Sequence, residues 1–170
     1  RMSLALFELG SISERRMDQL LDSKKSGLPP FLANNSGLES GMMIVQYSAG
    51  SALAEIHGHA APRTAFSTST SAGQEDHVSM GATACWNLYQ SCIRLSEVLA
   101  CELVIACQGL EYTTLNPASF VKSLHKLVRT ISPKLTKDRS ISAELQSIAK
   151  ILREGTWLSR IEAENERLVR

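Results

Sequence analysis

The stretch HVSMGATACWNLYQSCIRLSEVLACELVIACQ, residues 77–108, decides the fold class. Its apolar residues recur at helical spacings from His77 to about Gln108, which predicts one helix of about 30 residues, or roughly 45 Å. These residues cover most of the circumference of the helix, so one packing partner cannot bury them all. We therefore expect other helices to surround it, some of them from other subunits or from parts of the polypeptide outside these 170 residues.

The rest of the chain is also helical in its spacing, and no segment alternates like a strand. Irregular connections rich in Gly, Pro, Asn and Ser occupy 22–41 and 62–76. The fold class predicted is all-α, a bundle of long helices in one domain. Two further helices are expected over 2–21 and 42–61, and a third is opened by Asn116-Pro117 and closed near Pro133. A fourth is expected over 140–154, followed by Gly155, and a short charged helix over 157–170. Since the first of these begins at once and without a cap, we expect residue 1 to lie inside a helix of a longer protein.

Charge and composition exclude several classes of function. The net charge is +1 with no block of like charges, so we expect no nucleic-acid partner and no anionic membrane surface. No apolar run approaches the roughly 20 residues that span a bilayer, and no export signal is visible. The four cysteines, Cys85, Cys92, Cys101 and Cys107, are 7, 9 and 6 residues apart, which fits neither a zinc-type pair nor a disulfide framework. We therefore interpret the four cysteines as buried free thiols. Because free thiols are typical of reducing compartments, we expect a cytoplasmic protein.

A glycine, an amide, two carboxylates and an imidazole follow one another in SAGQEDHVSMG, residues 71–81, just ahead of the long helix. The commoner interpretation is capping, in which Ser71 or Asp76 accepts free N–H groups and Glu75 lies at the positive end of the helix dipole. The functional interpretation is a carboxylate presented by the tip of a rigid helix, with Gln74 as an amide partner. A metal site is the weakest interpretation, because adjacent side chains diverge, and no metal is expected.

Other chemistry-bearing residues favour structural roles. His57 and His59 lie on different faces of one helix, which is wrong for a shared metal, and solvated or packed rings are expected. His125 lies among lysines and is expected at the surface. From the residues alone, Met42 and Met43 need no role beyond core or interface packing.

Five separated motifs occur in the order and at about the spacing seen in one enzyme family. They are ELGSISERRMDQLLD (8–22), SGLPPFLANNSGLESGMMIVQYSAGSALAE (26–55), SAGQEDHVSMG (71–81), ELVIACQGLEY (102–112) and IAKILREG (148–155). Together they resemble the C-terminal half of the aromatic amino acid ammonia-lyases, which include histidine, phenylalanine and tyrosine ammonia-lyases and related aminomutases. The resemblance runs from Leu4 to about Leu158. It implies that residues 1–170 are the C-terminal helical portion of such an enzyme.

The resemblance implies elimination of ammonia from a small aromatic amino acid by a homotetramer whose active sites combine three subunits. The electrophile in this family is 4-methylideneimidazole-5-one (MIO), formed from an internal Ala-Ser-Gly. This chain has no Ala-Ser-Gly, only Ser-Ala-Gly at 48–50 and 71–73. The family's tyrosine base and carboxylate-binding arginine are also expected upstream, so the isolated chain is expected to be inactive.

The resemblance assigns roles to three residues here. Glu75 matches the family's active-site glutamate, which can hold the substrate ammonium or accept a proton, and its neighbour Gln74 is expected to line the same site. Met43 matches a position in the substrate side-chain pocket and favours histidine, since plant phenylalanine enzymes carry lysine there. Gly73, where the family usually has asparagine, weakens that preference. A tyrosine or phenylalanine lyase, an aminomutase, and a non-enzymatic helical assembly module stay open as alternatives.

Overall fold

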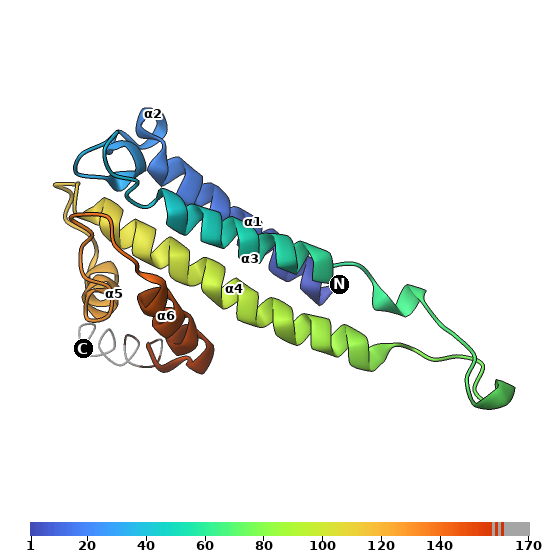
Figure 1. The fold of residues 1–170 in the computed structure, drawn as a ribbon. Coiled ribbons are helices and arrows are strands. Elements are labelled where there is room, and N and C mark those ends of the chain that lie inside the picture. Colours follow the sequence, from blue (N-terminus) through green and yellow to red (C-terminus); the bar gives the residue numbers. More distant parts are fainter. Residues whose placement is uncertain (158, 160, 162–170) are drawn as a thin grey trace.

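The computed structural model describes residues 1–157, 159 and 161, and its fold is all-α, as predicted. Three long helices, α1 (Met2–Leu21), α3 (Met43–His59) and α4 (Gly81–Leu110), pack side by side. α3 runs antiparallel to the other two (Figure 1). In the described residues the only β-type pairings are two isolated bridges, Ser36 with Glu39 and Thr70 with Glu75.

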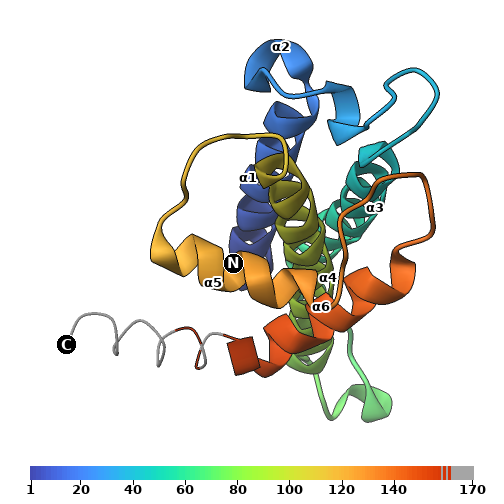
Figure 2. The same cartoon turned by 90° about the vertical axis from the view of Figure 1, so that its left-hand side faces the viewer.

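The remaining elements lie at the two ends of this three-helix layer and beside α4. The short α2 (Ser23–Ser26) and the 3₁₀ turn η1 (Pro30–Leu32) connect α1 to α3. α5 (Ser119–Arg129) and α6 (Ser142–Glu154) lie beside the C-terminal half of α4, and Figure 2 shows them crossing the long helices. The 3₁₀ turns η2 (Arg63–Ala65) and η3 (Ser71–Gly73) belong to a loop at the opposite end.

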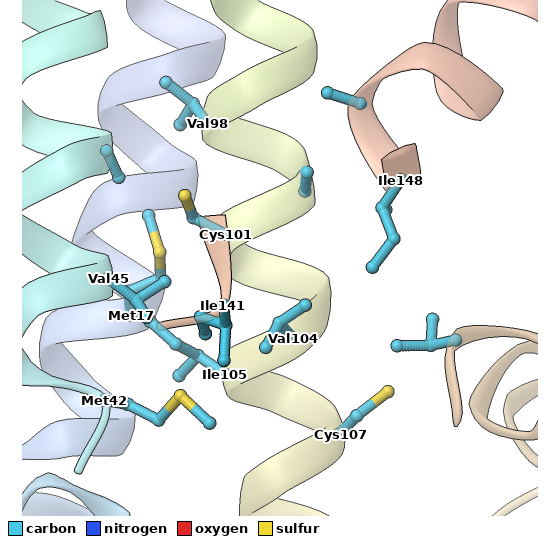
Figure 3. Packing of buried hydrophobic residues seen from close by; sticks show 14 of the residues in the cluster. Met17, Met42, Val45, Val98, Cys101, Val104, Ile105, Cys107, Ile141 and Ile148 are labelled. Atoms are coloured by element: carbon cyan, nitrogen blue, oxygen red, sulfur yellow. The ribbon is translucent and has the colours of Figure 1, made fainter. Parts of the chain in front are cut away.

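The core lies between the three long helices and continues between α4 and α6. Gly10 of α1 permits the close approach of α3, because a Cβ atom there would lie 2.9 Å from Cδ1 of Leu53. The small residues Ala49 and Ala52 of α3 are both buried in the same core. Figure 3 shows the packing around α4, in which the labelled side chains are Met17, Met42, Val45, Val98, Cys101, Val104, Ile105, Cys107, Ile141 and Ile148.

α4 is covered unevenly along its length. From Leu95 to Gly109 most of its residues are buried, whereas Asn87 and Ser91 are the buried residues of its first half. Trp86 and Tyr89, whose rings are 5.7 Å apart, are 61% and 58% exposed. The first half of α4 therefore presents an aromatic surface that α1 and α3 leave uncovered.

Three predicted helix starts are early by two residues or more, and one of them is the helix expected from 140, because α6 begins at Ser142. The helix expected from His77 begins at Gly81, because Met80 adopts a left-handed φ of +54° that cannot continue a helix. The helix expected from Asn116-Pro117 begins at Ser119, because Ala118 is extended at ψ 157°. The predicted start at Met2 and the end at Glu154, with Gly155 at φ +69°, are confirmed. Most of the expected helix over 157–170 falls outside the described residues.

In the part of the chain that the structure describes, every helix is either too short or too polar to cross a membrane.

Candidate functional site

Glu75 and Gln74 lie on a loop, residues 63–80, that extends past the ends of the long helices (Figure 1). The base of the loop is attached to α4 by Arg63. With the Asn87 amide turned so that its oxygen faces Arg63, this oxygen accepts from Nε at 2.7 Å and Nη2 at 3.0 Å. Higher up, the two arms are joined where the backbone N–H of Val78 donates to Oγ of Ser67 at 2.9 Å. The loop thus has a defined path although its side chains are almost all exposed.

The tip of the loop is a tight turn that orients Glu75. Thr70 N–H donates to the Glu75 carbonyl at 2.9 Å and Glu75 N–H donates to the Thr70 carbonyl at 3.3 Å. Between them Ser71, Ala72 and Gly73 all have positive φ, at +55°, +55° and +85°. Only glycine adopts this conformation without cost, and each of the other two residues costs on the order of 1–2 kcal/mol. Local strain of this kind is found most often where a site needs a side chain in one place.

The carboxylate of Glu75 is free to meet a ligand. Thr70 Oγ1 donates to Glu75 Oε2 at 3.1 Å, and the side chain is exposed, as is that of Gln74. Within residues 1–157, 159 and 161, no cationic side chain forms an ion pair with Glu75. One oxygen is therefore oriented by a hydroxyl, while the other can accept from an ammonium or an N–H group.

The structure corrects where both interpretations place residues 71–77 relative to the helix. α4 begins at Gly81 and receives no side-chain cap from the described part of the chain, so neither Ser71 nor Asp76 caps it and Glu75 does not lie at its dipole. Glu75 is also not presented by the helix tip itself but by the turn several residues ahead of it. Val78 and Met80 fit helical spacing and so predict an earlier start, but the left-handed backbone of Met80 overrides that signal.

Met43 lies at the opposite end of α3, as its first residue. Its neighbour Met42 is 1% exposed in the core, whereas Met43 is half-buried and reaches the surface. α3 has 17 residues and is therefore about 25 Å long. Because loop 63–80 continues beyond the far end of that helix, Met43 and Glu75 of one chain cannot contact the same amino acid (Figure 1).

Asp138 is a residue at the Met43 end that the sequence reasoning missed. Its carboxylate accepts hydrogen bonds from the backbone N–H groups of Ser40 and Gly41, at 2.7 and 2.9 Å. These bonds hold the pKa of the Asp138 carboxyl below its usual value. Asp138 lies between Lys137 and Arg139 in an irregular segment, and no local pattern distinguishes it from a solvated surface acid.

The histidines on the helices, His57, His59 and His125, have separate surroundings. His57 is exposed and packs on Phe7, with ring centroids 4.9 Å apart. His59 is partly buried, and its Nδ1 has no hydrogen-bond partner among the residues that the structure describes. His125, expected at the surface, is instead half-buried, with Nε2 3.1 Å from the carboxylate of Glu111. In the described residues, no group of three His, Cys, Asp or Glu is placed to hold a metal ion.

The four cysteines are free, as predicted, but only two of them are buried. Burial raises the pKa of Cys101 to about 12 and that of Cys107 to about 11. Cys85 and Cys92 are exposed, because they lie on the first half of α4, which α1 and α3 leave partly uncovered.

Known proteins match this chain both in sequence and in structure. A family model described as aromatic amino acid lyase matches residues 1–130. The chain is 43% identical over 157 residues to the histidine ammonia-lyase of Deinococcus radiodurans, covering 92% of this chain and 30% of that protein. The crystal structure of histidine ammonia-lyase from Trypanosoma cruzi matches with a TM-score of 0.89 at 36% identity, over 95% of this chain and 32% of that one. Tyrosine aminomutase from Streptomyces globisporus matches with the same TM-score at 28% identity, over 95% and 31%.

The chain thus spans about a third of the length of the relatives that it matches. The family match includes all three residues singled out from the sequence, Met43, Gln74 and Glu75, and it extends over more than half of the chain. The chain belongs to the aromatic amino acid lyase family.

Proposed function

We propose that this chain is the C-terminal helical portion of an aromatic amino acid ammonia-lyase whose substrate is L-histidine. The reaction would convert L-histidine to urocanate and ammonia. The single observation that carries the reaction class is the family match over residues 1–130. The choice of histidine is supported by the 43% identity to the Deinococcus radiodurans histidine ammonia-lyase and by methionine at position 43.

Within that reaction we assign Glu75 to the amino group of the substrate. Elimination breaks the bond between Cα and nitrogen and removes a proton from Cβ. The exposed carboxylate can hold the substrate nitrogen as an ammonium, which takes the bonding electron pair and leaves as neutral ammonia. Gln74, next to it on the same turn, supplies an amide that can orient the substrate.

The residues of this chain fit a site whose electrophile comes from elsewhere. When present, the family's methylideneimidazolone group withdraws electrons from the substrate. The chain has no Ala-Ser-Gly from which to form it, so by itself the chain is proposed to be inactive. The turn at 70–75 suits such a partner, because it presents the carboxylate on an exposed tip with no cation of its own among the described residues.

We further propose that the working enzyme is a cytoplasmic homotetramer. Two observations support assembly: Met43 and Glu75 lie at opposite ends of α3, and Trp86 and Tyr89 leave an aromatic surface on α4. A site that needs both residues must take them from different copies of the chain. The exposed rings are of the kind that subunit contacts bury.

The test is performed on the complete protein. L-Histidine, L-tyrosine and L-phenylalanine are supplied in turn, and the ultraviolet absorbance of urocanate, coumarate or cinnamate is followed. We expect the largest kcat/KM with histidine. Absence of turnover on all three would refute the lyase assignment. Conversion of tyrosine or phenylalanine to a β-amino acid would establish an aminomutase instead, the alternative favoured by the match to the Streptomyces globisporus enzyme.

Glu75→Gln tests the role of the carboxylate in the same protein. We expect kcat to fall by about 10²–10⁴-fold, as for loss of an acid/base group. The thermal stability should stay unchanged, because the side chain is exposed and caps no helix. Glu8→Gln, on the exposed face of α1, is the matched control and should leave both quantities unaltered. A Glu75→Gln enzyme with wild-type kcat would remove Glu75 from the chemistry.

A further inference from the structure

The turn ahead of α3 has a demanding backbone. Gly41 has a φ of +56°, and a Cβ atom there would lie 2.5 Å from the carbonyl oxygen of Phe31. The next residue, Met42, donates its N–H to that same oxygen at 2.9 Å. The opposing loop is itself strained, because Phe31 and Leu32 have positive φ values of 53° and 54°. Such a turn keeps its shape only if its surroundings hold it.

Asp138 supplies that hold from 98 residues away. Its two carboxylate oxygens each take one N–H of the turn, Oδ2 from Ser40 and Oδ1 from Gly41. Both donors lie ahead of the first helical residue, and α3 has no other side-chain cap. This fork, the pair of hydrogen bonds from Ser40 and Gly41 to Asp138, therefore acts with the backbone bond from Met43 to Ser40 to hold the first turn of α3 in place.

Asp138 can act as a fixed point because its own segment, 133–141, is anchored on both sides. The fully buried amide of Gln108 donates to the Leu135 carbonyl at 2.8 Å and accepts from the Leu135 N–H at 3.1 Å. On the other side Arg139 forms an ion pair with Glu144 of α6. The segment is thus attached to α4 before Asp138 and to α6 after it.

A second contact links the same two loops. Nδ2 of Asn34 donates to the Thr136 carbonyl at 2.9 Å, and the hydroxyl of Tyr112 donates to Oδ1 of Asn34 at 2.8 Å. The loop before α3 and segment 133–141 are therefore joined at two places. Only the Asp138 contact reaches the residues next to Met43.

We propose that Asp138 is a positioning residue for the substrate side-chain pocket, which it serves by fixing the turn at Ser40 and Gly41 and so the place of Met43. This inference rests on the proposed function, in which Met43 lines that pocket. Asp138 acts on substrate binding through Met43 and does not touch the reacting atoms. Its loss should weaken binding of the substrate side chain more than it slows the chemical step.

The experiment compares Asp138→Ala, Asp138→Asn and a control, Ser132→Ala, in the complete enzyme with L-histidine as substrate. Ser132 is buried and donates to Glu144 at 2.6 Å, so its loss disturbs the neighbourhood of the same segment but leaves the fork intact. Steady-state kinetics give KM and kcat separately. Hydrogen exchange of a peptide containing residues 38–46 reports on the turn without requiring any activity.

For Asp138→Ala we expect a rise in KM of about tenfold with kcat within about twofold, since a small displacement of a pocket wall acts on binding. Exchange of the Ser40 and Gly41 amides should accelerate about tenfold. Asp138→Asn keeps one acceptor and should fall between wild type and alanine in both quantities. Ser132→Ala should match wild type in KM and in exchange at 38–46.

Several outcomes would overturn the proposal, and they differ from one another. Faster exchange with an unchanged KM makes the fork purely structural, and unchanged exchange means that the fork does not form in solution. If both Asp138 variants fail to fold, Asp138 is needed for the stability of the protein and not specifically for the position of Met43. A wild-type enzyme without turnover on any of the three amino acids would instead remove the proposed function itself.

Discussion

Replacement of the buried Gln108 by methionine should loosen segment 133–141 without creating a cavity. Methionine has nearly the same volume, so the change removes the two hydrogen bonds to Leu135 and a longer one, of 3.5 Å, that Nη2 of Arg129 donates to Gln108. The Leu135 N–H and C=O are then unpaired in a residue that is only 6% exposed. Each unsatisfied buried group costs about 1–3 kcal/mol, so we expect a loss of about 3 kcal/mol. Arg129 would keep its bonds to Glu111 and to the Ser132 carbonyl.

Native-state hydrogen exchange of the complete protein measures this loss locally. At about 1.4 kcal/mol for each factor of ten, 3 kcal/mol corresponds to roughly a hundredfold faster exchange of the Leu135 amide. Gln19→Met on the exposed side of α1 is the matched control and should change exchange nowhere by more than a few tenths of a kcal/mol. If the Gln108 variant exchanges at Leu135 as slowly as the control, segment 133–141 is held by something other than this amide.

Three further predictions concern the turn and the thiols. Gly41→Ala should lower the free energy of unfolding by about 2–4 kcal/mol, because the residue has a left-handed φ and its new Cβ atom would lie 2.5 Å from a backbone oxygen. Gly37→Ala, at φ +93° in open space, should lower it by only about 1 kcal/mol. Chemical denaturation measures both. Cys101 and Cys107, with pKa values of about 12 and 11, should resist iodoacetamide at pH 8 in the folded protein and react after denaturation; modification of either in the native state would contradict their burial. Since the folded pKa of Asp138 is depressed, its stabilising effect should be complete above its ordinary pKa of about 3.9 and should disappear as the pH falls through the lower folded value, measured as protection of the turn amides. Protection that is constant down to about pH 2 would show that the ionised carboxylate is not needed.

Helical periodicity by itself determined most of the fold of this protein. α1 begins at Met2 and ends at Leu21, as its spacing predicts, and α6 ends at Glu154 before a left-handed Gly155. These features are readable because a helix is built from hydrogen bonds four residues apart, so its signal is local. The motif that contains Glu75 was likewise visible as a cluster of adjacent residues.

The tertiary structure alone decided how these pieces meet. It decided that Glu75 sits on a strained turn and not on a helix tip, because the left-handed Met80 interrupts an otherwise helical pattern. It separated Met43 from Glu75 by the length of α3, and it brought Asp138 to Gly41 across 97 residues. A side chain that binds backbone groups so far away leaves no period in the sequence, since its partners are determined by packing between elements and not by spacing within one.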